Sequence, residues 1–282
     1  MKEDGTVNRA ALPAIFNPED LHALEMALDV RDRCGGTVTA MVMGPPAACE
    51  VLRDCLGRGA DRGVLVTDRK AAASDTLATS YILSCAVRKL GPVDLVFCGR
   101  QAIDGDTAQV GPQLAEKLDL PQITYAESIE AIEDGAITVR RNVGNGHEVV
   151  RSALPVLLTA TDTAPAARPP AVRKVMKAKK ARARVELDAA VAADLPDADE
   201  AARAAEVDRR AADLAGRGLG IDQWSLADID ADLAWCGREG SPTKVHRIQA
   251  VVLTGKGHKT VEPTDEGLVA LVGELIEDHT IG

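Results

Sequence analysis

The residues best suited to chemistry lie in one segment, Gly99–Gly111, which reads GRQAIDGDTAQVG. It follows a short apolar run and opens a stretch with helical periodicity. Backbone N–H groups at the start of a helix are free to bind phosphate, and the helix dipole adds to the attraction. Gly99 and Gly105 permit the close turns that a phosphate cradle needs, and Thr107 and Gln109 can donate further hydrogen bonds.

The same segment also fits a simpler interpretation. Asp106 or Thr107 at the start of a helix would cap its first amides, and the loop would then hold no ligand. Many strand–helix loops have this form without a binding role. The residue types alone therefore leave both interpretations open.

No second set of reactive residues is apparent. The five histidines show no metal-binding spacing, no two of the six cysteines have CxxC spacing, and no Ser/His/Asp set presents itself. We therefore predict no metal site and no catalytic side chain, and we expect the cysteines to be buried, reduced thiols. An adenine-nucleotide hydrolase would need a Ser/Gly-rich phosphate loop after its first strand, and none is visible.

Strands and helices alternate in the first half of the chain, which predicts a parallel sheet with helices on both faces. Such sheets bind ligands beyond the carboxyl ends of their strands, so the loops 43–46, 67–76 and 99–111 are the ones to examine. The expected strands are 37–43, 63–67 and 93–98. One helix is expected to start at Asn17, and three more are expected over 47–56, 74–90 and 106–118.

The second half has a different pattern. Segments 137–141 and 148–152 predict an antiparallel hairpin around an Asn-Gly turn, and 155–160 predicts a buried strand. Residues 188–215 suggest a mobile helix or disorder. A strand over 244–253 and a helix capped by Thr264 are expected at the end. We accordingly divide the chain into an α/β domain (1–165), a basic segment (166–184), an insertion (185–220) and a C-terminal arm (221–282).

The charge distribution excludes some classes of protein. The net charge of −10 argues against general nucleic-acid binding, although residues 168–184 hold eight basic residues and no acid. No apolar stretch reaches the roughly 20 residues that a membrane-spanning helix needs. The first residues are polar and lack a signal-peptide core, so we expect a cytoplasmic protein without a membrane span.

The run GRQAIDGDTAQVGPQLAEKL, followed by LPQITYAESI, strongly resembles the motif of electron-transfer flavoprotein β subunits. Phe16–Asp20, Met43–Pro46, Gly59–Arg62, Val175–Lys180 and Ser241–Val245 match the family in the same order. The resemblance covers nearly the whole chain. It implies an adenine-nucleotide-binding, Rossmann-like fold and a heterodimer with an α subunit that holds most of the electron-delivering FAD.

Site residues follow from this resemblance position by position. It implies AMP or a second FAD in the β subunit, with Asn17 and Met43 near the adenosine. The implied phosphate contacts are Ala102, Gly105, Asp106, Thr107, Ala108, Gln109 and Val110. Residues 168–176 match the family's docking segment for an acyl-CoA dehydrogenase, and the apolar contacts there would be Val172 and Met176.

Asp75, Thr76 and Thr79 resemble members that bind a full FAD, so we expect FAD rather than AMP. Thr76 and Thr79 are three residues apart and share one helix face, where they can offer hydroxyls to the N1/O2 edge of a reduced flavin. The simpler interpretation is helix capping by Ser74 or Asp75. A second FAD implies oxidation of NADH with bifurcation of its electrons to the α-subunit flavin and to a low-potential carrier such as ferredoxin.

The sequence departs from the family at two places. Family members open with a strand before the Asn-Pro-x-Asp segment, and this chain starts after that strand. We attribute this to a misplaced start codon or to an artificial boundary of the sequence, and we expect a gap in the sheet and a reduced adenine pocket. The second departure is the Ala/Asp/Glu/Arg-rich insertion, whose role the sequence does not indicate.

Overall fold

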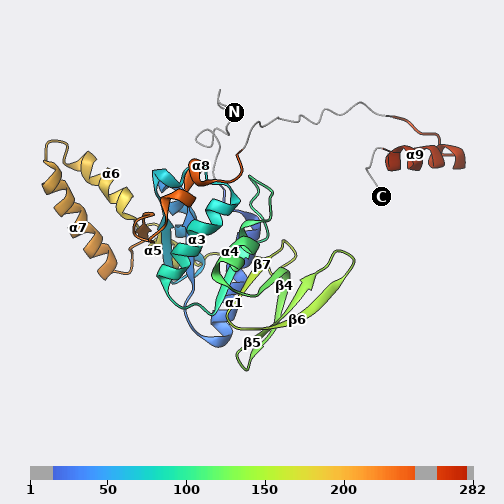
Figure 1. Cartoon of the computed structure of the whole chain (residues 1–282), viewed down its shortest axis with the longest axis horizontal. Coiled ribbons are helices and arrows are strands. Elements are labelled where there is room, and N and C mark those ends of the chain that lie inside the picture. Colours follow the sequence, from blue (N-terminus) through green and yellow to red (C-terminus); the bar gives the residue numbers. More distant parts are fainter. Residues whose placement is uncertain (1–14, 245–258, 278–282) are drawn as a thin grey trace. The chain divides into compact units, whose positions relative to one another are not determined.

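The computed structural model describes residues 15–244 and 259–277. These belong to two units, so helix α9 (Asp265–Glu277) is described by itself. In residues 15–244 the helices are α1 (Pro18–Cys34), α2 (Cys49–Arg58), α3 (Thr76–Leu90), α4 (Val110–Leu118), α5 (Val172–Ala178), α6 (Arg184–Asp194), α7 (Glu200–Gly216) and α8 (Gly237–Gly240) (Figure 1). Short 3-10 turns are η2 (Pro46–Ala48), η3 (Arg69–Ala71) and η4 (Leu233–Trp235).

The described strands form two sheets. Their bounds are β1 (Thr39–Met43), β2 (Arg62–Val66), β3 (Leu95–Gly99), β4 (Gln122–Glu133), β5 (Ala136–Asn142), β6 (His147–Ala153), β7 (Val156–Ala160) and β8 (Asp222–Trp224). One sheet has the order β1-β2-β8 and is parallel throughout. The other has the order β3-β7-β4-β5-β6, parallel from β3 to β4 and antiparallel through β5 and β6. The predicted α/β class is confirmed, and so is the predicted antiparallel hairpin, which β5 and β6 form.

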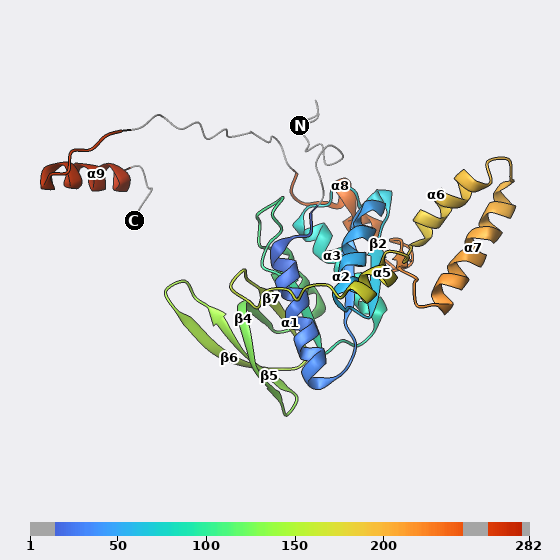
Figure 2. The same cartoon turned by 180° about the vertical axis from the view of Figure 1, so that it is seen from behind.

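Helices cover both faces of each sheet, as the alternation of buried side chains in a central strand shows. In β7, Val156 and Leu158 pack in the cluster that contains α1, whereas Leu157 between them packs against α4. In β2, Val64 and Val66 pack with α3, whereas Leu65 packs with α2. Successive strand residues point to opposite faces, so α1 and α2 lie on the faces opposite α4 and α3 (Figures 1 and 2).

The described strands form one parallel and one mixed sheet. Among the described residues, β1 and β3 belong to different sheets, which agrees with the expected interruption. Helix α1 joins the two sheets because its sides pack on different cores. Met26 packs in the cluster of β4, β5 and β7, while Leu28 packs with α2 and β1. Burial of each such side chain contributes about 1.5–3 kcal/mol, so α1 is a main stabiliser of the arrangement.

The insertion is a helical hairpin, so of the two alternatives expected for residues 188–215 the helical one holds and disorder does not. Helices α6 and α7 lie antiparallel beside α5 (Figure 2) and bury Leu187, Val191 and Val207 between them. The hairpin is attached to α2 through Arg53, whose side chain is only 10% exposed. Arg53 donates to both carboxylate oxygens of Glu186, at 3.0 and 2.9 Å. Partial burial raises the pKa of Glu186, but the bonds from Arg53 and the Ala183 amide outweigh it and hold the pKa below its ordinary value.

The C-terminal part is described only from residue 259 to residue 277. Thr264 caps α9 as expected, because its Oγ1 accepts from the Gly267 amide at 3.1 Å. Within its own unit α9 exposes Leu268, Val269, Val272 and Ile276. The strand expected over 244–253 lies outside the described residues apart from Lys244. No described helix is long and apolar enough to cross a membrane.

Candidate nucleotide-binding site

The loop between β3 and α4 is held by the start of α1. The Gly99 amide donates to Asp20 Oδ1 at 2.6 Å, and the Gln101 amide donates to Glu19 Oε2 at 2.8 Å. A Cβ on Gly99 would stand 2.7 Å from the Asp20 backbone nitrogen, so only glycine fits this contact. Glu19 and Asp20, the two acids in the first turn of α1, therefore fix the loop on that helix.

Asn17 also binds this loop. Its Nδ2 donates to the Gln101 carbonyl at 2.9 Å, and its Oδ1 accepts from the Ile103 amide at 3.2 Å. Asn17 occupies the N-cap position of α1 but makes no side-chain capping bond there, because its amide is used by the loop. The structure thus places Asn17 against the predicted phosphate loop, and its expected place near the adenosine stays a prediction.

Helix α4 begins four residues later than expected. Its first residue is Val110 and its N-cap is Gln109, so the expected start at residue 106 was wrong, and the simpler interpretation that Asp106 or Thr107 caps the helix does not hold. The physical reason is the left-handed backbone of Asp106 and Ala108, both at φ 51°, which interrupts any helix over these residues. The Asp106 carboxylate instead accepts from Gln101 Nε2 at 2.8 Å.

This backbone conformation leaves amides free. Left-handed Ala108 is followed by right-handed Gln109 (φ −101°, ψ −28°), and such an alternation turns successive N–H groups into one anion-binding concavity. Within the described part of the chain, the amides of Ala108, Gln109 and Val110 have no hydrogen-bond acceptor. Strained residues of this kind persist where the surroundings hold them and are concentrated at ligand sites. The loop therefore fits a phosphate group better than a simple connection does.

The start of α3 meets this loop through side chains. The Thr76 hydroxyl donates to Gln109 Oε1 at 2.9 Å, and Gln113 Nε2 donates to Thr76 Oγ1 at 3.4 Å. Gln113 Oε1 also accepts from the Ser80 hydroxyl at 3.3 Å. Thr79 is half-buried, and its hydroxyl has no hydrogen bond within the described residues. Two helix starts thus lie side by side, with Thr76 in the contact between them.

Asp75 has a structural role. Its carboxylate accepts from the Ala78 amide at 2.9 Å and from both the amide and the hydroxyl of Thr243, at 2.9 and 2.7 Å. Its own amide donates to Ser241 Oγ at 2.9 Å. Burial raises the pKa of Asp75, but these bonds outweigh it and hold the pKa below its ordinary value. The capping interpretation is therefore correct for Asp75, and its contact with a cofactor stays a prediction.

The remaining predicted residues divide by position. Ala102, Gly105 and Thr107 lie in the exposed part of the loop. Met43 is at the end of β1, pairs with Val66 and packs beside the core of β2 and α3. No hydrogen bond described here joins Met43 to the loop, so its role near adenosine stays a prediction. Within residues 15–244 and 259–277, no three His, Cys, Asp or Glu side chains are grouped as metal ligands.

The predicted docking segment is partly helical rather than a loop. In α5, Val172 is 79% exposed and Met176 is 56% exposed, and the two lie one turn apart on one face. The opposite side packs on α2, where a Cβ on Gly57 would lie 3.3 Å from Val175 Cγ2. The two predicted anchor side chains are therefore displayed on a fixed helix.

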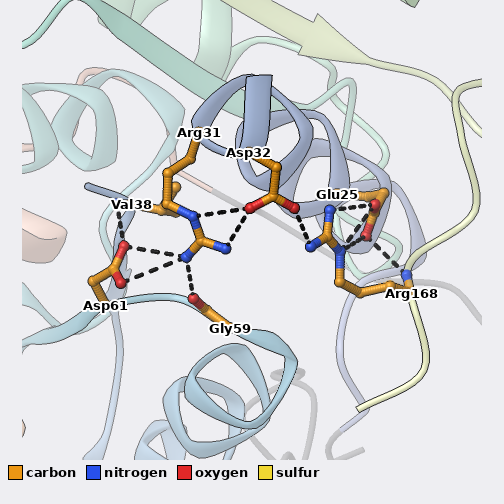
Figure 3. A network of polar contacts seen from close by, with 7 residues as sticks. All are labelled: Glu25, Arg31, Asp32, Val38, Gly59, Asp61 and Arg168. Atoms are coloured by element: carbon orange, nitrogen blue, oxygen red, sulfur yellow. Dashed lines mark hydrogen bonds and ion pairs between the residues drawn. The ribbon is translucent and has the colours of Figure 1, made fainter. Parts of the chain in front are cut away.

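A chain of ion pairs fixes the start of this segment (Figure 3). Arg168 binds Glu25 on α1 at 2.9 Å and Asp32 at 2.6 Å. Asp32 also accepts from Arg31, which reaches Asp61 at 3.3 Å. Hydrogen bonds from Arg168 and Arg31 hold the pKa of Asp32 below its ordinary value. The segment is thus tied to α1 just before α5.

The two sheets covered by helices define an α/β protein, and the loop with free amides at the carboxyl end of β3 is its candidate phosphate site. The family model described as "Electron transfer flavoprotein domain" matches residues 4–195. The chain belongs to the electron transfer flavoprotein family, which confirms the resemblance found in the sequence. The match ends before α7.

Relatives extend the similarity over nearly the full chain. The electron transfer flavoprotein subunit beta of Clostridium acetobutylicum is 38% identical over 277 residues, which are 98% of this chain and 92% of the relative. CarD, a subunit of the caffeyl-CoA reductase-Etf complex of Acetobacterium woodii, is 38% identical over 279 residues, 98% of this chain and 92% of the relative. Protein FixA of Sinorhizobium fredii is 39% identical over 96% of this chain and 84% of its own length. The role of the chain is accordingly electron transfer of the β-subunit type.

Proposed function

We propose that this chain is the nucleotide-binding β subunit of a heterodimeric electron-transfer flavoprotein and that its own site takes FAD. The observation that carries the proposal is the set of free amides at Ala108–Val110, held at the carboxyl end of β3 by Asn17, Glu19 and Asp20. Free N–H groups in a concave turn bind the pyrophosphate common to FAD and related dinucleotides.

The residues at the start of α3 support FAD over AMP. Thr76 contacts Gln109, so the amides of the loop and the first turn of α3 belong to one site. Thr79, three residues on, presents a hydroxyl that no described residue uses. The two threonines would donate to the flavin edge, where negative charge is favoured by a helix start. FAD held there would supply the redox chemistry, namely hydride acceptance from NADH and transfer of single electrons.

The partners follow from the exposed surfaces. The α subunit would cover apolar side chains such as Leu233 and Trp235, and also the apolar residues of α9. We propose an obligate heterodimer in which the C-terminal arm contacts the α subunit. Val172 and Met176 on α5 would dock an acyl-CoA dehydrogenase, and the basic residues beside them would steer acidic partners. A low-potential carrier such as ferredoxin would take the second electron.

The test is the cofactor content of the complex. The chain is co-expressed with its α subunit, the complex is reconstituted with excess FAD, and extracted nucleotides are counted per αβ pair. Two flavins and direct bleaching by NADH support the proposal. One flavin and one AMP would instead make the chain a simple electron carrier, and no nucleotide beyond the α-subunit flavin would overturn the site itself.

A matched pair of variants sharpens this test. Thr79→Val removes the unused hydroxyl with little change in shape, and it should lower FAD retention in the β site. Thr138→Val makes the same change at a half-buried position on β5, outside the site, and should retain FAD normally. If the two variants retain equal amounts of FAD, Thr79 does not contribute to the site.

A further inference from the structure

The hairpin insertion forms a groove with the docking segment. A cavity of about 310 Å³ is lined by Met176, Lys177 and Lys180 on one side and by Arg217 and Leu219, at the end of α7, on the other. Leu219 is 5% exposed and forms an apolar floor. Arg217 and Leu219 follow the region matched by the family model, which ends at residue 195.

The turn after α7 is held against the basic segment 166–184, which includes the docking segment. Arg182 donates its amide to the Leu219 carbonyl at 3.1 Å, and the Ile221 amide donates to the Arg182 carbonyl at 2.9 Å. Lys177 reaches the same turn, because a Cβ on Gly218 would lie 3.3 Å from Lys177 Nζ. Both walls of the groove are therefore fixed by backbone contacts, and the groove is part of the folded unit.

The charge of the groove indicates what it would bind. Lys177 and Lys180 are exposed and have no acidic partner within the described residues. Arg217 has one ion pair, from Nη1 to Asp213 Oδ2 at 3.0 Å, and its side chain is otherwise open to solvent. These three cationic side chains surround the apolar side chains of Met176 and Leu219. Such a surface is complementary to a ligand segment in which carboxylates flank one apolar side chain.

We propose that the α6–α7 hairpin completes the docking site and that this groove receives an acidic segment of the redox partner, in which Asp or Glu residues flank one apolar side chain. The inference rests on the proposed function and extends it. The anchor residues on α5 would dock the acyl-CoA dehydrogenase, whereas Arg217 and Leu219 would add a second contact from the end of the hairpin. The hairpin would thus determine which dehydrogenase is accepted.

The experiment measures electron transfer from the αβ complex to the acyl-CoA dehydrogenases of the same organism, with KM and kcat determined separately. Arg217→Glu should raise KM for the accepted dehydrogenase about tenfold at low salt and leave kcat unchanged, since a charge at the rim of an interface acts mainly on association. The increase should shrink as salt is added. Arg217→Lys, which keeps the charge, should behave like the unaltered protein.

Arg209→Glu is the matched control. Arg209 is exposed on the same helix and lies eight residues before Arg217, about 12 Å along the helix axis. Equal KM values for Arg217→Glu and Arg209→Glu would overturn the inference, and the proposed function would stand if Val172→Ala still weakened transfer. No transfer from the unaltered complex to any of these dehydrogenases would overturn both. A further outcome is that inorganic phosphate, at constant ionic strength, inhibits transfer to the dehydrogenase only when Arg217 is present. That result would show that the groove binds a small anion and would overturn the docking of a protein segment there.

Discussion

The contact between Gly99 and the start of α1 predicts a large effect of Gly99→Ala. The added Cβ would stand 2.7 Å from the Asp20 nitrogen, 2.8 Å from Asp20 Oδ1 and 2.8 Å from the Glu19 carbonyl carbon. Two of these atoms are backbone and the third is held by its bond to the Gly99 amide, so none can move aside alone. The loop or the first turn of α1 must shift instead.

The expected loss has two parts. Overfilling a packed contact costs about 1–3 kcal/mol of unfolding free energy. The shift also stretches the bond from the Gly99 amide to the Asp20 carboxylate, and a hydrogen bond to a charged group contributes about 1.5–3 kcal/mol. The two losses share one displacement and do not add fully, so we expect a total of about 2–4 kcal/mol.

Gly105→Ala in the same loop is the control. No atom lies within 4 Å of its Cβ position, and its backbone is not left-handed. Alanine there should change stability by less than about 1 kcal/mol, because only the entropy of the unfolded chain is affected. Urea unfolding of the αβ complex, followed by circular dichroism, compares the two variants, and extraction measures the nucleotide each retains. Equal midpoints would show that α1 does not hold the loop as described.

Three further predictions concern the ends of the helices. Asp75→Asn should lower the free energy of unfolding, measured with urea at pH 7, by about 1–2 kcal/mol. The pKa of Asp75 is lowered in the folded state, so the stabilisation by its carboxylate is present above about pH 4 and is lost on further acidification. The difference in unfolding free energy between Asp75→Asn and the unaltered protein should therefore disappear at low pH. Val172→Ala should weaken electron transfer to an acyl-CoA dehydrogenase with unchanged cofactor content and stability, because Val172 is exposed; unaltered transfer would contradict its role. Glu186→Gln should raise KM for the same dehydrogenase without changing kcat or cofactor content.

The sequence predicted the elements better than their assembly. The apolar residues of the predicted segment 63–67, between helical patterns, identify the parallel strand β2, and Asn-Gly identifies the turn between β5 and β6. The order of the strands depends on pairing between segments that are far apart in the sequence. Strand β7 lies between β3 and β4, and the three-residue β8 pairs with β2, which ends 156 residues earlier in the chain. Local periodicity carries no signal for either, and β4 and β8 were not predicted.

The site was found from its motif, but its geometry was not. The late start of α4 depends on the left-handed backbone of Asp106 and Ala108. This conformation is uncommon for residues other than glycine, so the residue types did not predict it. The roles of Glu19 and Asp20 depend on a contact across 79 residues or more. The sequence left helix and disorder open for the insertion, because few apolar residues, among them Val207, form the small core between α6 and α7.

The effect expected of Glu186→Gln follows from how the docking segment is held. Arg168 fixes it before α5, and Arg53 with Glu186 fixes the hairpin behind it, so Val172 and the groove are presented without a large loss of entropy on binding. Glutamine keeps the shape of Glu186 but removes the charge that balances the largely buried Arg53. The hairpin should then loosen, and association should weaken while the nucleotide site, which lies on other elements, keeps its chemistry. A KM unchanged by Glu186→Gln, together with a large effect of Arg217→Glu, would mean that the backbone contacts of Arg182 suffice to hold the groove.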